Sequence, residues 1–173
     1  HAQESERTMK RMTEQVTIVV FGASGDLARR KLIPALYHLA AQNLLSEEFT
    51  LLGFARSSFE DESYRQHLLE GLQEHMNSEH NGGGVDEMIW EKFAQNIYYQ
   101  SGNYDERKSF ETLAKRVKAL QPAGNGPQNL LFYLATPPEV FEPITDLLDA
   151  VGLVTPETDN EHGWTRIIIE KPF

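Results

Sequence analysis

The amino-acid sequence predicts an α/β fold in which a mainly parallel sheet lies between two layers of helices. Short runs of β-branched and aromatic residues alternate with longer stretches of helical periodicity, a pattern typical of parallel strands joined by crossover helices. Most of the short runs are almost continuously apolar, as expected of strands covered on both faces. The chain has 173 residues, 40% hydrophobic and 24% charged, so it can form one globular domain with its own core.

Five short apolar runs are the predicted strands. Each is bounded by polar or turn-forming residues. In chain order they are 16–21 (VTIVVF), 50–54 (TLLGF), 96–100 (NIYYQ), 129–135 (NLLFYLA) and 166–170 (RIIIE). We expect the tyrosines of the third run to pack within the sheet.

Five amphipathic stretches are the predicted helices, because apolar residues recur within them at helical spacing. They are 27–44, 61–76, 86–95, 105–120 and 138–151, with loops at 77–84 and 121–128. Pro34 lies inside the first stretch, and proline is tolerated only in the first turn of a helix. We therefore expect a short turn over 27–30 followed by the helix proper, with a kinked helix as the alternative.

Charge and cysteine content exclude several classes of function. The 26 acidic residues outnumber the 16 lysines and arginines, and the net charge of -10 has the wrong sign for a nucleic-acid-binding surface. We therefore expect no nucleic-acid partner. The chain has no cysteine and its six histidines show no ligand spacing, so we expect no metal site. The basic residues Lys115, Arg116 and Lys118 are expected to form a solvated helix face.

Hydropathy bears on the location of the protein. No run approaches the ~18 consecutive apolar residues of a membrane-spanning helix, so we expect no membrane segment. Residues 1–15 are polar and lack the apolar core of a secretory signal. They are predicted to form a flexible leader ahead of a domain over 16–173, and a cytoplasmic location is expected.

The join between the first predicted strand and helix, VVFGASGDLARRK at 19–31, carries the strongest functional signal. Its spacing is G-x-x-G-x-x-A. Gly22 allows a sharp turn, Gly25 allows the backbone to approach a pyrophosphate, and Ala28 allows close packing of helix on sheet. The free N–H groups at the helix start favour an anion. No G-K-[ST] follows, which excludes a Walker loop. The prediction is a Rossmann-like dinucleotide-binding domain, and a purely structural glycine turn is the alternative.

The end of the second strand predicts which dinucleotide binds. An acid there hydrogen-bonds the ribose hydroxyls of NAD, whereas an arginine accepts the 2'-phosphate of NADP. The sequence is GFARSS, which places Arg56 at this position, while Glu60 and Asp61 come later. Ser24 in the glycine turn adds a hydroxyl. NADP is therefore the predicted cofactor, with a solvated surface arginine as the alternative.

Four segments together resemble the amino-terminal coenzyme domain of the glucose-6-phosphate dehydrogenase family. They are GASGDLARRKLIPAL (22–36), GFARS (53–57), FYLATPP (132–138) and GWTRIIIEKPF (163–173), within a resemblance that covers 16–173. The resemblance implies a coenzyme domain followed by a larger substrate domain that this chain lacks. It also implies a homo-oligomeric enzyme that oxidises β-D-glucose 6-phosphate to 6-phosphogluconolactone with NADP, in the oxidative pentose phosphate pathway.

The resemblance also implies site residues. The pyrophosphate site is carried over onto Gly22, Ala23, Ser24, Gly25, Asp26 and Leu27, the 2'-phosphate site onto Arg56 with Ser24, and further coenzyme contacts onto Tyr104, Ala135, Thr136, Pro137, Pro138, Glu170 and Lys171. Lys171 of the EKP motif is expected to contact the sugar near the nicotinamide. A lysine at the carboxyl end of a parallel strand points into the ligand crevice, and Glu170 is either its partner or a strand-end charge.

The family's general base is a histidine in an H-Y-L-G-K segment beyond the EKPFG motif, and this chain ends at Phe173. We therefore expect the chain to bind NADP with little or no turnover. The sequence also fits two alternatives: a sugar oxidoreductase of the glucose-fructose oxidoreductase and inositol dehydrogenase group, and a non-catalytic dinucleotide-binding module. The glycine spacing argues against the first, because that group has G-x-G-x-x-G.

Overall fold

The computed structural model describes residues 15–78, 83–121, 128–154 and 163–170. Five parallel strands form one sheet in the order β3-β2-β1-β4-β5. The strands are β1 (Thr17–Phe21), β2 (Thr50–Ala55), β3 (Ile97–Ser101), β4 (Leu130–Leu134) and β5 (Thr165–Ile169). This confirms the predicted fold class, and each strand lies within about one residue of its predicted bounds. The leader at 1–14 lies outside the described residues.

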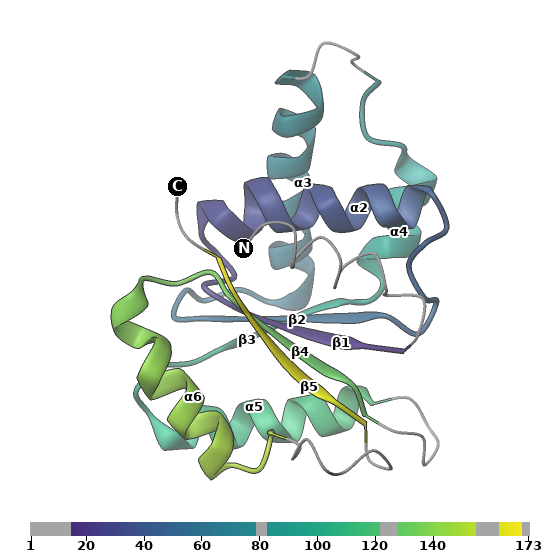
Figure 1. Ribbon diagram of the computed structural model, residues 1–173. Coiled ribbons are helices and arrows are strands. Elements are labelled where there is room, and N and C mark those ends of the chain that lie inside the picture. Colours follow the sequence, from purple (N-terminus) through teal and green to yellow (C-terminus); the bar gives the residue numbers. More distant parts are fainter. Residues whose placement is uncertain (1–14, 79–82, 122–127, 155–162, 171–173) are drawn as a thin grey trace.

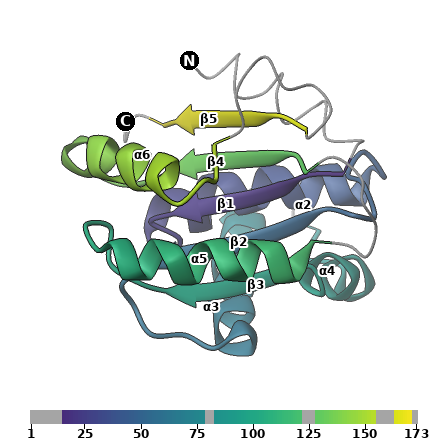
Figure 2. The same ribbon diagram turned by 90° about the horizontal axis from the view of Figure 1, so that it is seen from below.

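Helices cover both faces of the sheet (Figure 1). The first layer contains α2 (Ile33–Ala41), α3 (Asp61–Ser78) and α4 (Glu87–Ala94), and the second contains α5 (Arg107–Leu120) and α6 (Phe141–Ala150). Figure 2 shows α5 and α6 from below, lying across the second face. The central strands β1, β2 and β4 are buried along their whole length, which explains their continuous apolar sequences. Each face has its own apolar cluster, so the domain has three layers.

The first helix differs from the prediction. No separate turn precedes it; instead a π-helical turn, η1 (Ala28–Leu32), runs directly into α2. The N–H of Ile33 donates to the carbonyl of Ala28, five residues back. This wider turn carries the chain past Pro34, which has no N–H to donate, without ending the helix. The helix then ends at Ala41 rather than at residue 44, and Asn43 follows with a φ of 57°.

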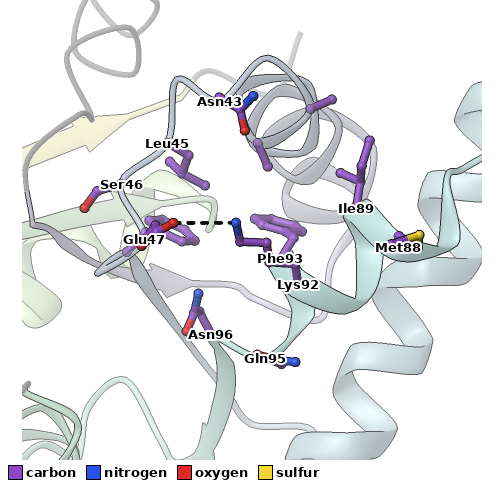
Figure 3. A pocket seen from close by; sticks show the side chains of 13 residues that line it. Asn43, Leu45, Ser46, Glu47, Met88, Ile89, Lys92, Phe93, Gln95 and Asn96 are labelled. Carbon is purple, nitrogen blue, oxygen red and sulfur yellow. Dashed lines mark ion pairs between the residues drawn. The ribbon is translucent and has the colours of Figure 1, made fainter.

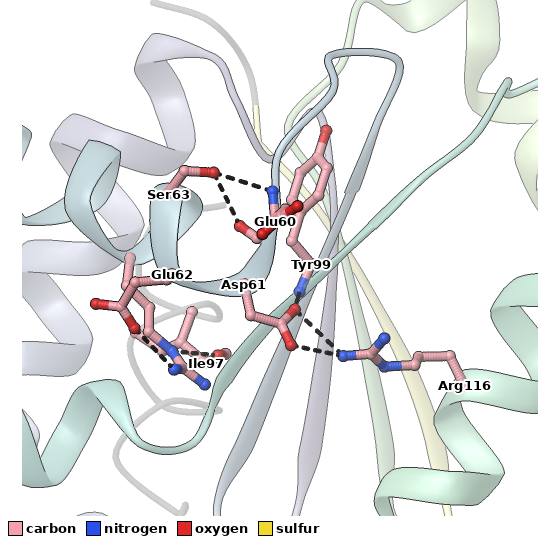
Figure 4. Close-up of polar contacts among 8 residues, drawn as sticks. Glu60, Asp61, Glu62, Ser63, Ile97, Tyr99 and Arg116 are labelled. Carbon is pink, nitrogen blue, oxygen red and sulfur yellow. Dashed lines mark hydrogen bonds and ion pairs between the residues drawn. The ribbon is translucent and has the colours of Figure 1, made fainter.

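One predicted surface feature is also corrected. Arg116 does not belong to a purely solvated face, because its guanidinium bonds the carboxylate of Asp61 at 2.9 Å (Figure 4). The same carboxylate accepts the N–H of Tyr99 at 2.8 Å. Asp61 begins α3, so this contact ties the start of α3 to β3 and α5. Sequence separation hides such a pairing, since the partners are 55 positions apart.

The strand order places a crevice at the carboxyl ends of β1 and β4. From β1 the chain first builds β2 and β3 on one side, and α5 then returns it to β4 on the other side of β1. The loops that follow β1 and β4 therefore diverge in opposite directions. In open parallel sheets, ligands bind at this point, where the strand order reverses.

Buried tyrosines predict how stability changes at high pH. Burial raises the pKa of Tyr64, Tyr133 and Tyr99 above 10.0, to about 12 for Tyr99, and Glu170 adds to the increase at Tyr133. Between about pH 10 and about pH 12 the unfolded chain therefore binds fewer protons than the folded one, so rising pH favours unfolding. We expect the free energy of unfolding in urea to keep this contribution below about pH 10 and to lose it progressively toward about pH 12. A free energy that stays constant over this interval would contradict the burial of these phenols.

Candidate functional site

A cavity of about 580 Å³ lies at the predicted crevice. Its volume is within the range of small-molecule sites, roughly 300–1,000 Å³. It is lined by residues that follow β1, β2, β3 and β4: Gly22, Ser24, Gly25, Ala55, Arg56, Ser57, Tyr104, Ala135, Thr136 and Pro137. The fold thus brings together in one cavity most of the residues that the sequence predicts for the coenzyme. Ala23, Asp26, Leu27, Pro138 and Glu170 are not among the lining residues.

The glycine turn has the sharp geometry that the sequence predicts at Gly22. This residue has a φ of +78°, and a Cβ there would collide with the carbonyl oxygen of Ala135. Its N–H is shared between the hydroxyl of Tyr104 at 2.8 Å and the carbonyl of Phe54 at 3.1 Å. The N–H of Gly25 donates back to the carbonyl of Gly22 at 3.0 Å. These two amides therefore hold the turn rather than face a ligand.

The amides that remain can hold an anion. Within the described residues, no hydrogen bond of the chain engages the N–H groups of Ser24, Asp26 and Leu27. Helical backbone begins at Asp26, two residues before η1, so these N–H groups lie at the positive end of that helix. A Cβ at Gly25 would meet only the carbonyl oxygen of Gly22, at 3.4 Å, so no contact within the protein requires glycine there. The absence of a side chain at Gly25 leaves room for a pyrophosphate to approach.

The loop after β2 gathers polar groups beside the turn. Arg56 is exposed, and among the described residues it has no carboxylate partner. The hydroxyl of Ser57 lies 3.2 Å from that of Ser24 and donates to it. The acid that comes next in the loop, Glu60, is bonded through its own backbone to Ser63. Among the described residues, no acid lines the cavity beside Arg56.

Tyr104 joins the turn to the end of β2. Its hydroxyl accepts the N–H of Gly22 and lies 3.4 Å from the carbonyl of Phe54, to which it can donate. Burial raises its pKa, while the Gly22 N–H and the positive charge of Arg56 oppose that increase. The phenol is thus held protonated in the wall of the cavity. The resemblance implies that this tyrosine lies near the coenzyme. In the structure its hydroxyl bonds the glycine turn.

The loop after β4 contributes an unpaired polar atom. The N–H of Ala135 donates to the carbonyl of Phe21 at 2.9 Å, which fixes the start of the loop. Thr136 is 7% exposed, and its hydroxyl oxygen has no hydrogen-bond partner among the described residues. A buried hydroxyl without a partner is costly, and a ligand in the cavity can supply one. Pro138 begins the short helix η2 (Pro138–Val140), and Phe141 follows it in α6 as a partly buried apolar residue.

Glu170 is buried at the end of β5, and Lys171 lies outside the described residues. The carboxylate of Glu170 accepts a hydrogen bond from Lys31 Nζ at 2.8 Å. It also raises the pKa of Tyr133 through its charge and a hydrogen bond. Lys31 was not identified from the sequence as a site residue, and 139 residues separate it from Glu170. No local pattern marks Lys31 in the sequence as a site residue; the structure places it in the π-helical turn after the glycine motif.

A larger cavity, about 710 Å³, lies at the other edge of the sheet (Figure 3). Its wall includes Phe49 and Asn96, which directly precede β2 and β3, so it lies at the amino ends of the strands. Phe49 and Phe93 stack there, and Lys92 pairs with Glu47 at 3.6 Å. Parallel sheets bind ligands at the carboxyl ends of their strands, so we assign the smaller cavity as the candidate site.

Over the part of the chain that the structure describes, histidine, aspartate and glutamate side chains form no group of three or more that could hold a metal ion. In the same residues, no helix combines the length and the apolar character needed to cross a bilayer.

The strand order and the turn at its reversal define a class of protein: a dinucleotide-binding domain of the Rossmann type. Comparison with known families agrees, because residues 19–173 match the family described as "Glucose-6-phosphate dehydrogenase, NAD binding domain". The chain belongs to this family. It binds a nicotinamide dinucleotide, and the free turn amides and the unpaired Thr136 hydroxyl fit such a ligand.

Individual relatives share the same description. A glucose-6-phosphate 1-dehydrogenase of Chlamydia pneumoniae is 37% identical over 156 residues, covering 90% of this chain and 30% of the relative. A chloroplastic one of Nicotiana tabacum is 39% identical over 158 residues, covering 91% of this chain and 25% of the relative. The chain therefore spans less than a third of the length of these relatives.

Solved structures give the same fold. A glucose-6-phosphate dehydrogenase in complex with glucose 6-phosphate superposes with a TM-score of 0.76 at 30% identity, covering 94% of this chain and 31% of that one. The enzyme of Mycobacterium avium superposes with a TM-score of 0.72 at 26% identity, covering 92% and 30%. These structures match the predicted α/β class and its parallel sheet.

Proposed function

We propose that this chain is the NADP-binding domain of a glucose-6-phosphate 1-dehydrogenase, in which Arg56, Ser24 and Ser57 bind the 2'-phosphate. The observation that carries NADP over NAD is the exposed Arg56 at the end of β2, which has no carboxylate partner among the described residues and has the two serine hydroxyls beside it. Arginine binds phosphate through two parallel hydrogen bonds, and within the described part of the chain no acid competes for the guanidinium. The family match does not favour the glucose-fructose oxidoreductase alternative.

The remaining residues divide the nucleotide between two loops. The amides of Ser24, Asp26 and Leu27 bind the pyrophosphate, and Thr136 bonds the ribose on the nicotinamide side. The bound dinucleotide supplies the hydride acceptor. In this proposal Lys171 contacts glucose 6-phosphate, and the Lys31–Glu170 pair holds the end of β5, which directly precedes it in the sequence. The domain thus positions the coenzyme at the carboxyl edge of the sheet.

The whole protein is proposed to be a homo-oligomeric, cytoplasmic enzyme of glucose metabolism. Relatives that include an enzyme bound to glucose 6-phosphate support this substrate. In this proposal a leader at 1–15 precedes the coenzyme domain, and a further domain supplies the general base. The 173-residue chain is therefore expected to bind NADP but to form little or no NADPH from glucose 6-phosphate. Sustained NADPH formation by this chain, measured by absorbance, would show that a base within it suffices.

Arg56→Ala tests the assignment of the 2'-phosphate. Removing a charge-assisted hydrogen bond costs roughly 1.5–3 kcal/mol, so we expect the NADP affinity to fall by about 10- to 100-fold. The NAD affinity should stay unchanged, because NAD has no 2'-phosphate. Isothermal titration calorimetry with each nucleotide measures both values.

Arg107→Ala is the matched control, since Arg107 is an exposed arginine that pairs with Glu111 on α5. It should leave both affinities unchanged. Equal loss of NADP and NAD affinity in Arg56→Ala, or equal affinity of the unmodified chain for the two nucleotides, would contradict the NADP assignment.

A further inference from the structure

Four aromatic side chains lie under both loops of the coenzyme site. Phe59 precedes α3, Tyr64 and His67 belong to α3, and Tyr99 belongs to β3. We call them the ring cluster. Phe59 lies 5.1 Å from His67 and 5.3 Å from Tyr99, and Tyr64 lies 4.7 Å from Tyr99, measured between ring centroids. Packing alone does not require the hydroxyls of the two tyrosines, so their polar contacts need a separate explanation.

Two members of the ring cluster hold consecutive carbonyls of the glycine turn. The Tyr64 hydroxyl donates to the carbonyl of Ala23 at 2.9 Å, and His67 Nε2 lies 3.1 Å from the carbonyl of Ser24. A carbonyl only accepts, so this contact requires a proton on Nε2. In a trans peptide the C=O and N–H point in opposite directions. Because the Ala23 carbonyl is held inward, the Ser24 N–H of the same peptide faces outward, where it can bind phosphate.

Strand β2 leaves room for the Tyr64 side chain to reach the glycine turn. A Cβ at Gly53 of β2 would lie 2.8 Å from the Tyr64 hydroxyl oxygen and 2.8 Å from the Ala23 Cβ. Glycine at this strand position therefore lets the phenol reach across the sheet to the turn. The Tyr64 side chain is fully buried, and burial raises its pKa. The hydroxyl consequently remains a donor throughout the neutral range.

Tyr99 acts in the same way on the other loop. Its hydroxyl lies 2.6 Å from the carbonyl of Ser57 and 3.2 Å from that of Ala55, the two residues that flank Arg56. Its backbone N–H is held by Asp61, which fixes the ring's position relative to α3 (Figure 4). Burial raises the pKa of Tyr99 to about 12, so this phenol also stays protonated. The single proton of this hydroxyl is shared between the two carbonyls, with the shorter contact to Ser57, so one side chain anchors the loop on both sides of Arg56.

We propose that the ring cluster positions the two loops for different parts of the nucleotide, and so contributes to the selection of NADP over NAD. Tyr64 orients the Ser24 amide, and His67 fixes the next peptide, whose Gly25 N–H closes the turn onto Gly22. Both contacts shape the pyrophosphate site, which serves both nucleotides. Tyr99 orients the loop that carries Arg56, which serves only the 2'-phosphate. The ring cluster touches no nucleotide atom in this account. The inference rests on the proposed function and adds that different members of the ring cluster support the pyrophosphate site and the 2'-phosphate site.

Tyrosine-to-phenylalanine variants of the 173-residue chain test this division. A single neutral hydrogen bond is worth about 1 kcal/mol, so each loss is expected to change affinity by roughly 5- to 10-fold. Tyr99→Phe should weaken NADP binding by that factor and leave NAD binding within about twofold. Tyr64→Phe should weaken the binding of both nucleotides by similar factors. Calorimetric titration of each variant with each nucleotide gives the split.

Tyr37→Phe is the matched control. Tyr37 is buried on the same face of the sheet, and its hydroxyl accepts the N–H of Asp86 at the start of α4, away from the site. It should lower thermal stability without changing either affinity. Partly exposed His67 gives a second pair of variants that does not depend on deep burial: His67→Leu should weaken both nucleotides, and His67→Gln, which keeps an N–H donor, should restore them.

The outcomes separate the inference from the proposed function. If the unmodified chain prefers NADP and Arg56→Ala removes that preference, the proposed function stands. Unchanged affinities in the tyrosine variants, or an equal loss of NADP and NAD affinity in Tyr99→Phe, would then overturn the inference alone. If the unmodified chain shows no preference for NADP, both are overturned.

Discussion

Gly22→Ala is expected to lower the free energy of unfolding by roughly 3 kcal/mol or more, the largest effect of any single substitution considered for stability. Two costs combine at this residue. A backbone φ of +78° is one that residues with a Cβ rarely adopt. The added Cβ would also collide with the carbonyl oxygen of Ala135 and lie 2.8 Å from its carbonyl carbon. Backbone offers no flexible atom that can move aside, so the loops after β1 and β4 must separate.

Gly152→Ala separates these two costs. Gly152 has almost the same φ, +79°, but a Cβ there would meet nothing within 4 Å. It should therefore cost only the conformational part, about 1–2 kcal/mol. Urea unfolding of both variants followed by circular dichroism gives the comparison. Equal destabilisation by the two substitutions would contradict the close approach of Gly22 to the loop after β4.

Gly25→Ala is expected to have the largest effect on binding, a loss of dinucleotide affinity of about 100-fold or more. Its Cβ would occupy the space through which phosphate oxygens approach the amides of Ser24 and Asp26. The stability of the chain should change little, because the only contact within 4 Å is with the carbonyl oxygen of Gly22 at 3.4 Å. NADP and NAD should be affected alike, since both carry the pyrophosphate.

Gly83→Ala is the control for Gly25→Ala. Gly83 precedes α4, and a Cβ there would meet nothing within 4 Å. This variant should match the unmodified chain in unfolding and in calorimetric titration. If Gly25→Ala binds both dinucleotides as tightly as the control does, the turn is a structural feature and the phosphate site lies elsewhere.

The sequence predicts those parts of this molecule that depend on patterns of neighbouring residues. The apolar runs of β1, β2 and β4 are buried on both faces, so nearly every residue in them reports the same environment. The sharp turn at Gly22 follows from the glycine spacing directly after β1, and the place of Arg56 follows from its position directly after β2. Local sequence therefore predicts the fold class and most of the wall of the cavity at the carboxyl ends of the strands.

The parts that local pattern missed depend on partners far apart in the chain. Tyr99 was expected only to pack in the sheet, but its hydroxyl anchors the Arg56 loop across 42 residues. Lys31 reaches Glu170, and Arg116 reaches Asp61, over similar or greater separations. Hydrogen bonds of this kind arise from the packing of one element on another, and neither residue alone carries a periodic signal. The π-helical turn at Ala28–Leu32 is likewise set by how the helix accommodates Pro34 on the sheet.

The central claim is that the cavity at the carboxyl ends of β1, β2 and β4 binds the dinucleotide. Titration of the ¹⁵N-labelled chain with NADP, followed by the amide resonances in two-dimensional NMR, tests it most directly. The account predicts that the largest shifts occur at the amides of Ser24, Asp26 and Leu27, whose N–H groups have no partner among the described residues, and at the Arg56 loop. Shifts concentrated instead around Phe93 and Asn96, which line the larger cavity, would contradict it.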